Sequence, residues 1–218
     1  MSDKTIDVVT VAFVVIIGVA VERFLTEFPL KNDPVFKHPN PQAPRGSFQE
    51  APSKIYRLCY VLSLMAIVTL VLRFLIGSDF HLRHAYANAT AKLGVDNFIV
   101  DICFLMLFGA FIVGAALAER IQRFALWLAL FSAVAVIWSG IALIRGAQHD
   151  LICWWFTINA IQFGIGLAAL VLCLRYQNRH NLVIGALLIL SAWYVVIFPF
   201  DLEHILVKKS DRTDQVQQ

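Results

Sequence analysis

The sequence predicts an all-α, polytopic membrane protein: a six-helix up-and-down transmembrane bundle with a short interfacial helix in its second connection. The first observation is composition. Of the 218 residues, 59% are hydrophobic and only 15% are charged, and the mean hydropathy is +0.72, well outside the balance of soluble domains. The second is length, because a hydrocarbon core about 30 Å thick requires about 20 apolar residues per helix. The third is the distribution of turn-forming and charged residues, which divides the apolar sequence into six such stretches.

The predicted spans are residues 8–25, 55–76, 98–118, 124–144, 152–174 and 182–200. The first has the weakest pattern, because its continuous apolar run stops at Val21 and is followed by Glu22 and Arg23. A cleaved signal peptide is the competing interpretation of this segment. It lacks an A-x-A-like cleavage site, so we expect a retained helix.

The first connection, residues 29–54, holds six of the seven prolines. Proline lacks a backbone N–H and interrupts helices, so we expect an extended, polar surface loop rather than a helix. The loop can act as a tether between two spans or as a docking site for a protein partner. A tether is the simpler role.

The second connection has helical features. Apolar residues recur in it at helical spacing, Ser78 or Asp79 can cap a helix start, and Gly94 suits the end. These signals predict an interfacial helix over residues 79–93. The two short connections between the third, fourth and fifth spans predict antiparallel hairpins. A polar tail, residues 208–218, is expected after the last span.

The distribution of basic residues predicts the orientation in the membrane. Ten Lys and Arg lie near the spans on the side of the first, third and fifth connections, against four on the side of the termini. The positive-inside rule then places both termini outside a cell (inner) membrane, although basic residues of the tail weaken the bias. The lipid bilayer is the expected partner. Nucleic acid is not expected, because the net charge of +3 is small and forms no basic patch.

Arg73 and Asp101 are charged residues inside predicted spans. Both lie about one turn from the same membrane face, and Asp7 enters from that face too. A charge in lipid costs roughly 2.5 to 3.5 kcal/mol on insertion scales unless it is paired. We therefore expect an ion pair of Arg73 with Asp101, which Asp7 can share. The pair can serve as a proton or ion relay, or as a structural link within the bundle.

Two buried amides, Asn159 and Gln162, align on one face of the fifth predicted span. Amides in lipid require partners, so these side chains either bridge helices or line a wet path for a solute. Small residues repeat every four positions in the third to fifth spans. Such stripes permit close helix packing within the bundle, or a homo-oligomer seam.

A metal site is a weaker hypothesis. His81, His84 and His149 lie on the side of the termini, and His81 and His84 are three residues apart, which lets two imidazoles share one metal. No catalytic motif, phosphate loop or haem-type histidine pair occurs, and no cofactor is expected.

The favoured function is movement of an ion or small solute by a homo-oligomeric channel or transporter, with Arg73, Asp101, Asn159 and Gln162 along the route. The alternative is a non-enzymatic interaction or signalling subunit of a membrane complex. A metal-dependent membrane enzyme comes third.

Overall fold

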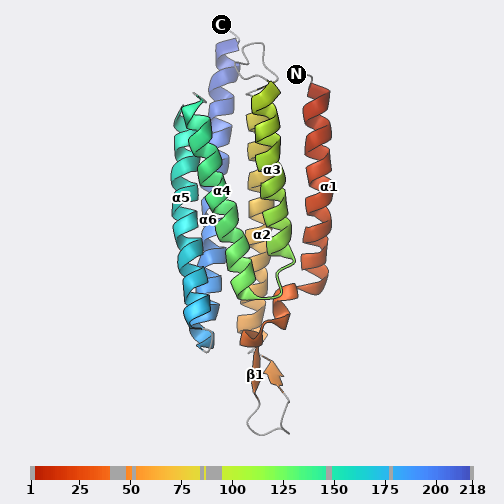
Figure 1. Cartoon of the computed structure of the whole chain (residues 1–218), viewed down its shortest axis with the longest axis vertical. Coiled ribbons are helices and arrows are strands. Elements are labelled where there is room, and N and C mark those ends of the chain that lie inside the picture. Colours follow the sequence, from red (N-terminus) through yellow and green to blue (C-terminus); the bar gives the residue numbers. More distant parts are fainter. Residues whose placement is uncertain are drawn as a thin grey trace.

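The structure, a computed structural model, describes residues 3–39, 48–50, 53–83, 86, 95–145, 149–176 and 179–216. Six long helices dominate it: α1 Asp3–Glu27, α2 Ser53–Leu82, α3 Val95–Ala116, α4 Ile121–Ile144, α5 His149–Arg175 and α6 His180–Val216. The helices run side by side along the long axis of the molecule, and α1 starts at the end of the bundle where α6 stops (Figure 1). The predicted all-α membrane bundle is confirmed.

Helices α2 to α6 form a ring. Each packs against the next, and α6 returns to α2. Within the part of the chain that the structure describes, these five are the helices long and apolar enough to cross a membrane. Their apolar segments are Lys54–Asp79, Asn97–Ala116, Ile121–Ile144, Ile152–Arg175 and His180–Glu203. The chain is therefore a multi-pass integral membrane protein.

The most extensive helix contact in the ring joins α4 and α5. A Cβ atom built on Gly166 would lie 3.1 Å from the Cα atom of Ala129 and 3.2 Å from its Cβ atom. Small residues at helix interfaces let two backbones approach in this way. Gly164 of α5 faces outward instead, since nothing lies within 4 Å of a Cβ atom built on it.

Helix α1 lies outside the ring against α2 and α3. Its buried residues Phe13, Ile17, Ala20 and Phe24 recur at helical spacing and face the bundle. Its outward face carries exposed valines, listed as Val8, Val11, Val14, Val15 and Val19. An apolar outer face suits lipid, but α1 is not among the five helices that meet the length and composition of a span. Its crossing of the bilayer stays a prediction.

The first connection differs from the extended polar loop that we predicted. Two short 3-10 helices, η1 Pro29–Asn32 and η2 Pro34–Phe36, precede a small antiparallel ribbon of β1 Lys37–Pro39 and β2 Phe48–Glu50. Each 3-10 helix starts with a proline, whose fixed φ and missing N–H are tolerated in a first turn.

Part of this connection is also buried. Leu30, Val35 and Phe36 are at most 5% exposed. The Asp33 carboxylate accepts hydrogen bonds from the backbone N–H of Val35 at 2.9 Å and of Ile121 at 2.7 Å. Asp33 therefore satisfies the first N–H group of α4, and ties the connection to the ring.

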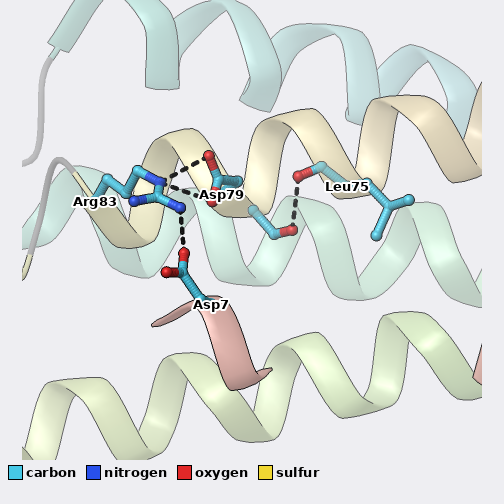
Figure 2. Close-up of polar contacts among 5 residues, drawn as sticks. Asp7, Leu75, Asp79 and Arg83 are labelled. Carbon is cyan, nitrogen blue, oxygen red and sulfur yellow. Dashed lines mark hydrogen bonds and ion pairs between the residues drawn. The ribbon is translucent and has the colours of Figure 1, made fainter. Parts of the chain in front are cut away.

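Helix α2 continues through the position where a separate interfacial helix was predicted to start. The Ser78 hydroxyl donates to the carbonyl of Leu75 at 3.1 Å, a bond typical of serine inside a helix (Figure 2). Asp79 accepts from Nε of Arg83 at 2.9 Å, one turn further on. The predicted helix start at Ser78 or Asp79 is therefore wrong, and the predicted end at Gly94 lies outside the described residues. Arg83 and Tyr86 lie in a π-helical turn, and residues 84–85 and 87–93 lie outside the described residues.

Helix α6 also runs past its predicted end. It passes through Pro199 and reaches Val216, so the backbone of residues 208–216 of the predicted tail is helical. Proline removes one helix hydrogen bond, but membrane helices tolerate this where neighbouring groups compensate. The continuation places Asp201 on the same helix, where it is 1% exposed.

Candidate functional site

Arg73 of α2 is buried in the ring and forms an ion pair with Asp201 of α6. Nε of Arg73 lies 2.5 Å from Oδ2 of Asp201, and the two side chains are 10% and 2% exposed. Nη1 of Arg73 donates to Oε1 of Gln162 on α5 at 2.6 Å. The indole Nε1 of Trp154 donates to Oδ1 of Asp201 at 2.9 Å. Three helices thus meet at these four residues, the Arg73 cluster.

The Arg73 cluster lies deeper than the sequence predicted. The apolar segment of α2 extends to Asp79, so Arg73 lies about 9 Å of helix rise inside its end. A charge at this depth requires a partner, because an isolated one in hydrocarbon is costly. Helix α6 supplies it, since it packs along α2.

Asp101 of α3 forms a second buried group of contacts, the Asp101 cluster. Its Oδ2 accepts from the Tyr86 hydroxyl at 2.6 Å and lies 2.9 Å from Nε2 of His81. Its Oδ1 accepts from Nε1 of Trp138 at 3.1 Å and lies 3.6 Å from Nη1 of Arg145. Burial, followed by the hydrogen bond to Asp101, raises the pKa of Tyr86.

The predicted ion pair of Arg73 with Asp101 is wrong. Arg73 faces α5 and α6, where it meets Gln162 and Asp201. Asp101 faces the end of α2 and α4 instead, where its carboxylate contacts the His81 imidazole and the Arg145 guanidinium. The two charges lie near the same end of the bundle, but the rotation of each helix about its axis directs them to different neighbours.

Asp7 of α1 is exposed and belongs to neither cluster. Its Oδ1 accepts from Nη2 of Arg83 at 2.6 Å, and Asp79 accepts from Nε of the same guanidinium (Figure 2). The predicted sharing of a buried pair by Asp7 is therefore wrong. The hydrogen bond from Arg83 to Asp7, then that to Asp79, raises the pKa of Arg83. Such exposed pairs contribute little to stability.

A pocket of about 60 Å³ touches both clusters, because Arg73 and Trp138 line it. Aromatic side chains supply much of its wall, namely Phe74, Phe108, Phe131, Trp138 and Trp155. These rings also contact one another. The Phe108 ring centroid lies 5.1 Å from that of Phe131 and 6.3 Å from that of Trp138, which limits how freely the wall can repack.

The two amides of α5 take different roles. Asn159 and Gln162 are 5% and 0% exposed, so both amides lie in the interior of the bundle. Gln162 bridges to α2 through Arg73, whereas Asn159 lines the pocket. Within the described residues, Oδ1 of Asn159 and Nε2 of Gln162 have no hydrogen-bond partner. An unsatisfied buried polar atom costs about 1 to 3 kcal/mol, which a bound molecule can recover.

A hydrogen bond crosses the ring next to the pocket. The hydroxyls of Ser132 on α4 and Tyr194 on α6 lie 2.9 Å apart, and both residues are at most 2% exposed. The Tyr194 hydroxyl also lies 3.2 Å from the carbonyl oxygen of Leu128, to which it can donate. Ser132 follows the pocket residue Phe131 directly, and Leu128 lies one turn nearer the start of α4. The contact therefore joins α4 to α6 close to the pocket.

Of the three histidines proposed as metal ligands, His81 alone has a described side chain. His81 contacts Asp101, His84 lies outside the described residues, and the His149 side chain is likewise not described. Among the described side chains, no group of three His, Cys, Asp or Glu is placed to hold a metal ion.

Sequence reasoning missed several residues of the site, among them Asp201, Trp138 and Trp155. Asp201 lies one residue past the predicted end of the last span, so it was not counted among the charges inside the membrane. Trp138 and Trp155 are apolar residues within spans, so hydropathy alone could not separate a pocket wall from packing. One available signal was helical continuity, since the turn that follows Phe200 is again partly apolar.

Comparison of the chain with protein-family models, with curated proteins and with solved structures gives no match.

Proposed function

We propose that the protein moves a small solute or ion across the membrane, and that the pocket lined by Arg73 and Asn159 is the solute site. The supporting observation is the carboxamide of Asn159. It is buried, it lines the pocket, and its Oδ1 has no hydrogen-bond partner within the described residues. A solute that donates a hydrogen bond would satisfy this acceptor.

The buried charges support the same proposal. A buried ion pair adds little net stability compared with well-packed apolar residues, and ionisable residues within spans commonly mark solute pathways. The pair of Arg73 with Asp201 lies next to the proposed site, so its side chains would contact or orient a solute there. A purely structural link would not need the adjoining pocket.

Movement through the ring requires a change at the contact of Ser132 with Tyr194. This hydrogen bond would separate the pocket from the membrane face at which α4 starts. Breaking it by rotation of Tyr194 would open the route, and remaking it would close the route behind the solute. The two hydroxyls are thus the proposed closure of the pathway on that side.

A homo-oligomer in a cell (inner) membrane, with both termini outside, is part of the proposal. Each protomer would carry its own pathway, because the pocket lies inside one ring. Mass measurement of the purified protein in detergent tests the oligomer. Accessibility of a C-terminal tag to added protease tests the orientation.

The transport experiment uses the full chain in liposomes. A panel of small solutes and ions is supplied, and flux is compared with that of protein-free liposomes. In the variant Gly77→Ala the added methyl group would lie 3.6 Å from the Trp155 ring, an ordinary contact that narrows the pocket. The control is Gly164→Ala, where nothing lies within 4 Å.

We expect flux above background, a lower flux for Gly77→Ala and an unchanged flux for Gly164→Ala. Equal flux with and without protein for the whole panel would overturn the proposal. An unchanged flux in Gly77→Ala would show that the pocket is not on the route.

A further inference from the structure

We infer that the pocket takes a small uncharged amide of the urea type, an inference that rests on the proposed transport function. Three properties of the pocket carry it: its size, the compensation of its charges, and the pair of polar groups in its lining. Each excludes a different class of solute.

Size excludes most metabolites. The pocket measures about 60 Å³, whereas an engineered apolar cavity that holds benzene measures about 150 Å³. On the same measure, one water molecule needs about 10 to 15 Å³. The pocket therefore fits a molecule of roughly four to six non-hydrogen atoms.

Charge compensation disfavours ions. Arg73 faces the pocket, but its charge is balanced by Asp201 at 2.5 Å. A cation in the pocket would be repelled by Arg73, and an anion would compete with Asp201 and leave that buried carboxylate unpaired. Trp138, which also lines the pocket, is uncharged. An uncharged solute meets neither penalty.

The polar lining matches an amide. Oδ1 of Asn159 can accept an N–H hydrogen bond. A guanidinium has five N–H donors, and the hydrogen bond and ion pair described for Arg73 engage Nε and Nη1. Arg73 can thus donate to a carbonyl oxygen on the same solute. The aromatic side chains of the wall can stack on the planar body of urea or formamide.

The experiment compares pairs of probes with equal shape and different charge. Proteoliposomes and protein-free liposomes receive urea or guanidinium, and in a second pair formamide or formate, and volume changes are followed by stopped-flow light scattering. The variant Asn159→Leu removes the amide at similar volume. The control Thr157→Val lies on the exposed face of the same helix, where the hydroxyl donates only locally to the Cys153 carbonyl within the described residues. Gel filtration and circular dichroism verify that each variant is folded.

We expect protein-dependent urea flux, and no protein-dependent flux of guanidinium or formate. Loss of one hydrogen bond should lower urea flux about three- to tenfold in Asn159→Leu, with Thr157→Val unchanged. Guanidinium or formate carried as well as urea would overturn the inference but leave transport standing. Protein-dependent flux of other solutes but not of urea would likewise overturn the urea inference and leave the transport proposal standing. Absence of protein-dependent flux for every probe and for the wider panel would overturn both.

Discussion

The guanidinium of Arg73 and the carboxylate of Asp201 lie 2.5 Å apart in the interior of the bundle. This contact joins the helix that starts the ring, α2, to the helix that ends it, α6. It also lies in the lining of the pocket through Arg73. One ion pair is thereby part of the architecture and part of the proposed site.

Replacing Asp201 by Asn should destabilise the protein by about 3 to 5 kcal/mol, because it leaves the Arg73 charge buried without its partner. The control is Asp79→Asn, which removes an exposed pair with Arg83 and should cost less than about 1 kcal/mol. Thermal unfolding in detergent, followed by circular dichroism, measures both. If both variants lost a similar amount of stability, the pair of Arg73 with Asp201 would be accessible to water in the native protein.

The double variant Arg73→Met with Asp201→Leu should recover much of the stability that Asp201→Asn loses, since no unpaired charge remains. Its solute flux should stay low. Recovery of flux together with stability would show that the pair is only structural.

Tyr86 should resist ionisation at alkaline pH, because burial and its hydrogen bond to Asp101 raise its pKa. A group whose pKa is higher in the folded state contributes stability that is present below its unfolded pKa of about 10, and that is lost as pH rises through the folded value. Phenolate absorbance during an alkaline titration should therefore be the same for the native protein and Tyr86→Phe until the protein unfolds. If the native protein gained more phenolate absorbance near pH 10 than Tyr86→Phe does, the pKa of Tyr86 would not be raised.

Gly166→Ala should loosen the contact of α4 with α5, because the new Cβ atom would lie 3.1 Å from the Cα atom of Ala129. Overpacking of this kind costs about 1 to 3 kcal/mol. Gly164→Ala has open space around it and should be neutral or stabilising by up to about 1 kcal/mol. Unfolding in mixed detergent tests the pair, and a loss confined to Gly164→Ala would reverse the assignment of the two faces of α5.

Asp33→Ala should destabilise the junction of the first connection with α4 by about 1 to 2 kcal/mol, as loss of a helix cap does. The adjacent Asn32 is exposed, and Asn32→Ala is its matched control. Limited proteolysis of the 29–54 connection reports the effect directly. Equal cleavage rates in the two variants would show that the hydrogen bonds of Asp33 are dispensable.

The helices were predictable from the sequence because a bilayer imposes a minimum apolar length. The predicted span 152–174 matches the apolar segment Ile152–Arg175 closely, and the span 124–144 ends with α4 at Ile144. Burial of Arg73, Asp101, Asn159 and Gln162 was predictable for the same reason, since polar groups within a span avoid lipid.

The partners of those residues were not predictable. Hydropathy fixes the depth of a side chain but not the rotation of its helix or the identity of its neighbours. Arg73 and Asp101 share one end of the bundle, yet α2 turns Arg73 toward Asp201. The pocket was hidden for a related reason, because Trp138 and Trp155 have the hydropathy of ordinary core residues.

The hydrogen bond of Asp33 to the backbone of Ile121 has a consequence for how the chain is made. Asp33 leaves the ribosome long before Ile121 has been added. The hydrogen bond between the two residues cannot form until α2 and α3 have entered the bilayer, and until then the Asp33 carboxylate is hydrated or bound to other groups. The amino-terminal segment can therefore reach its final position only late in biosynthesis, after insertion of the fourth helix begins.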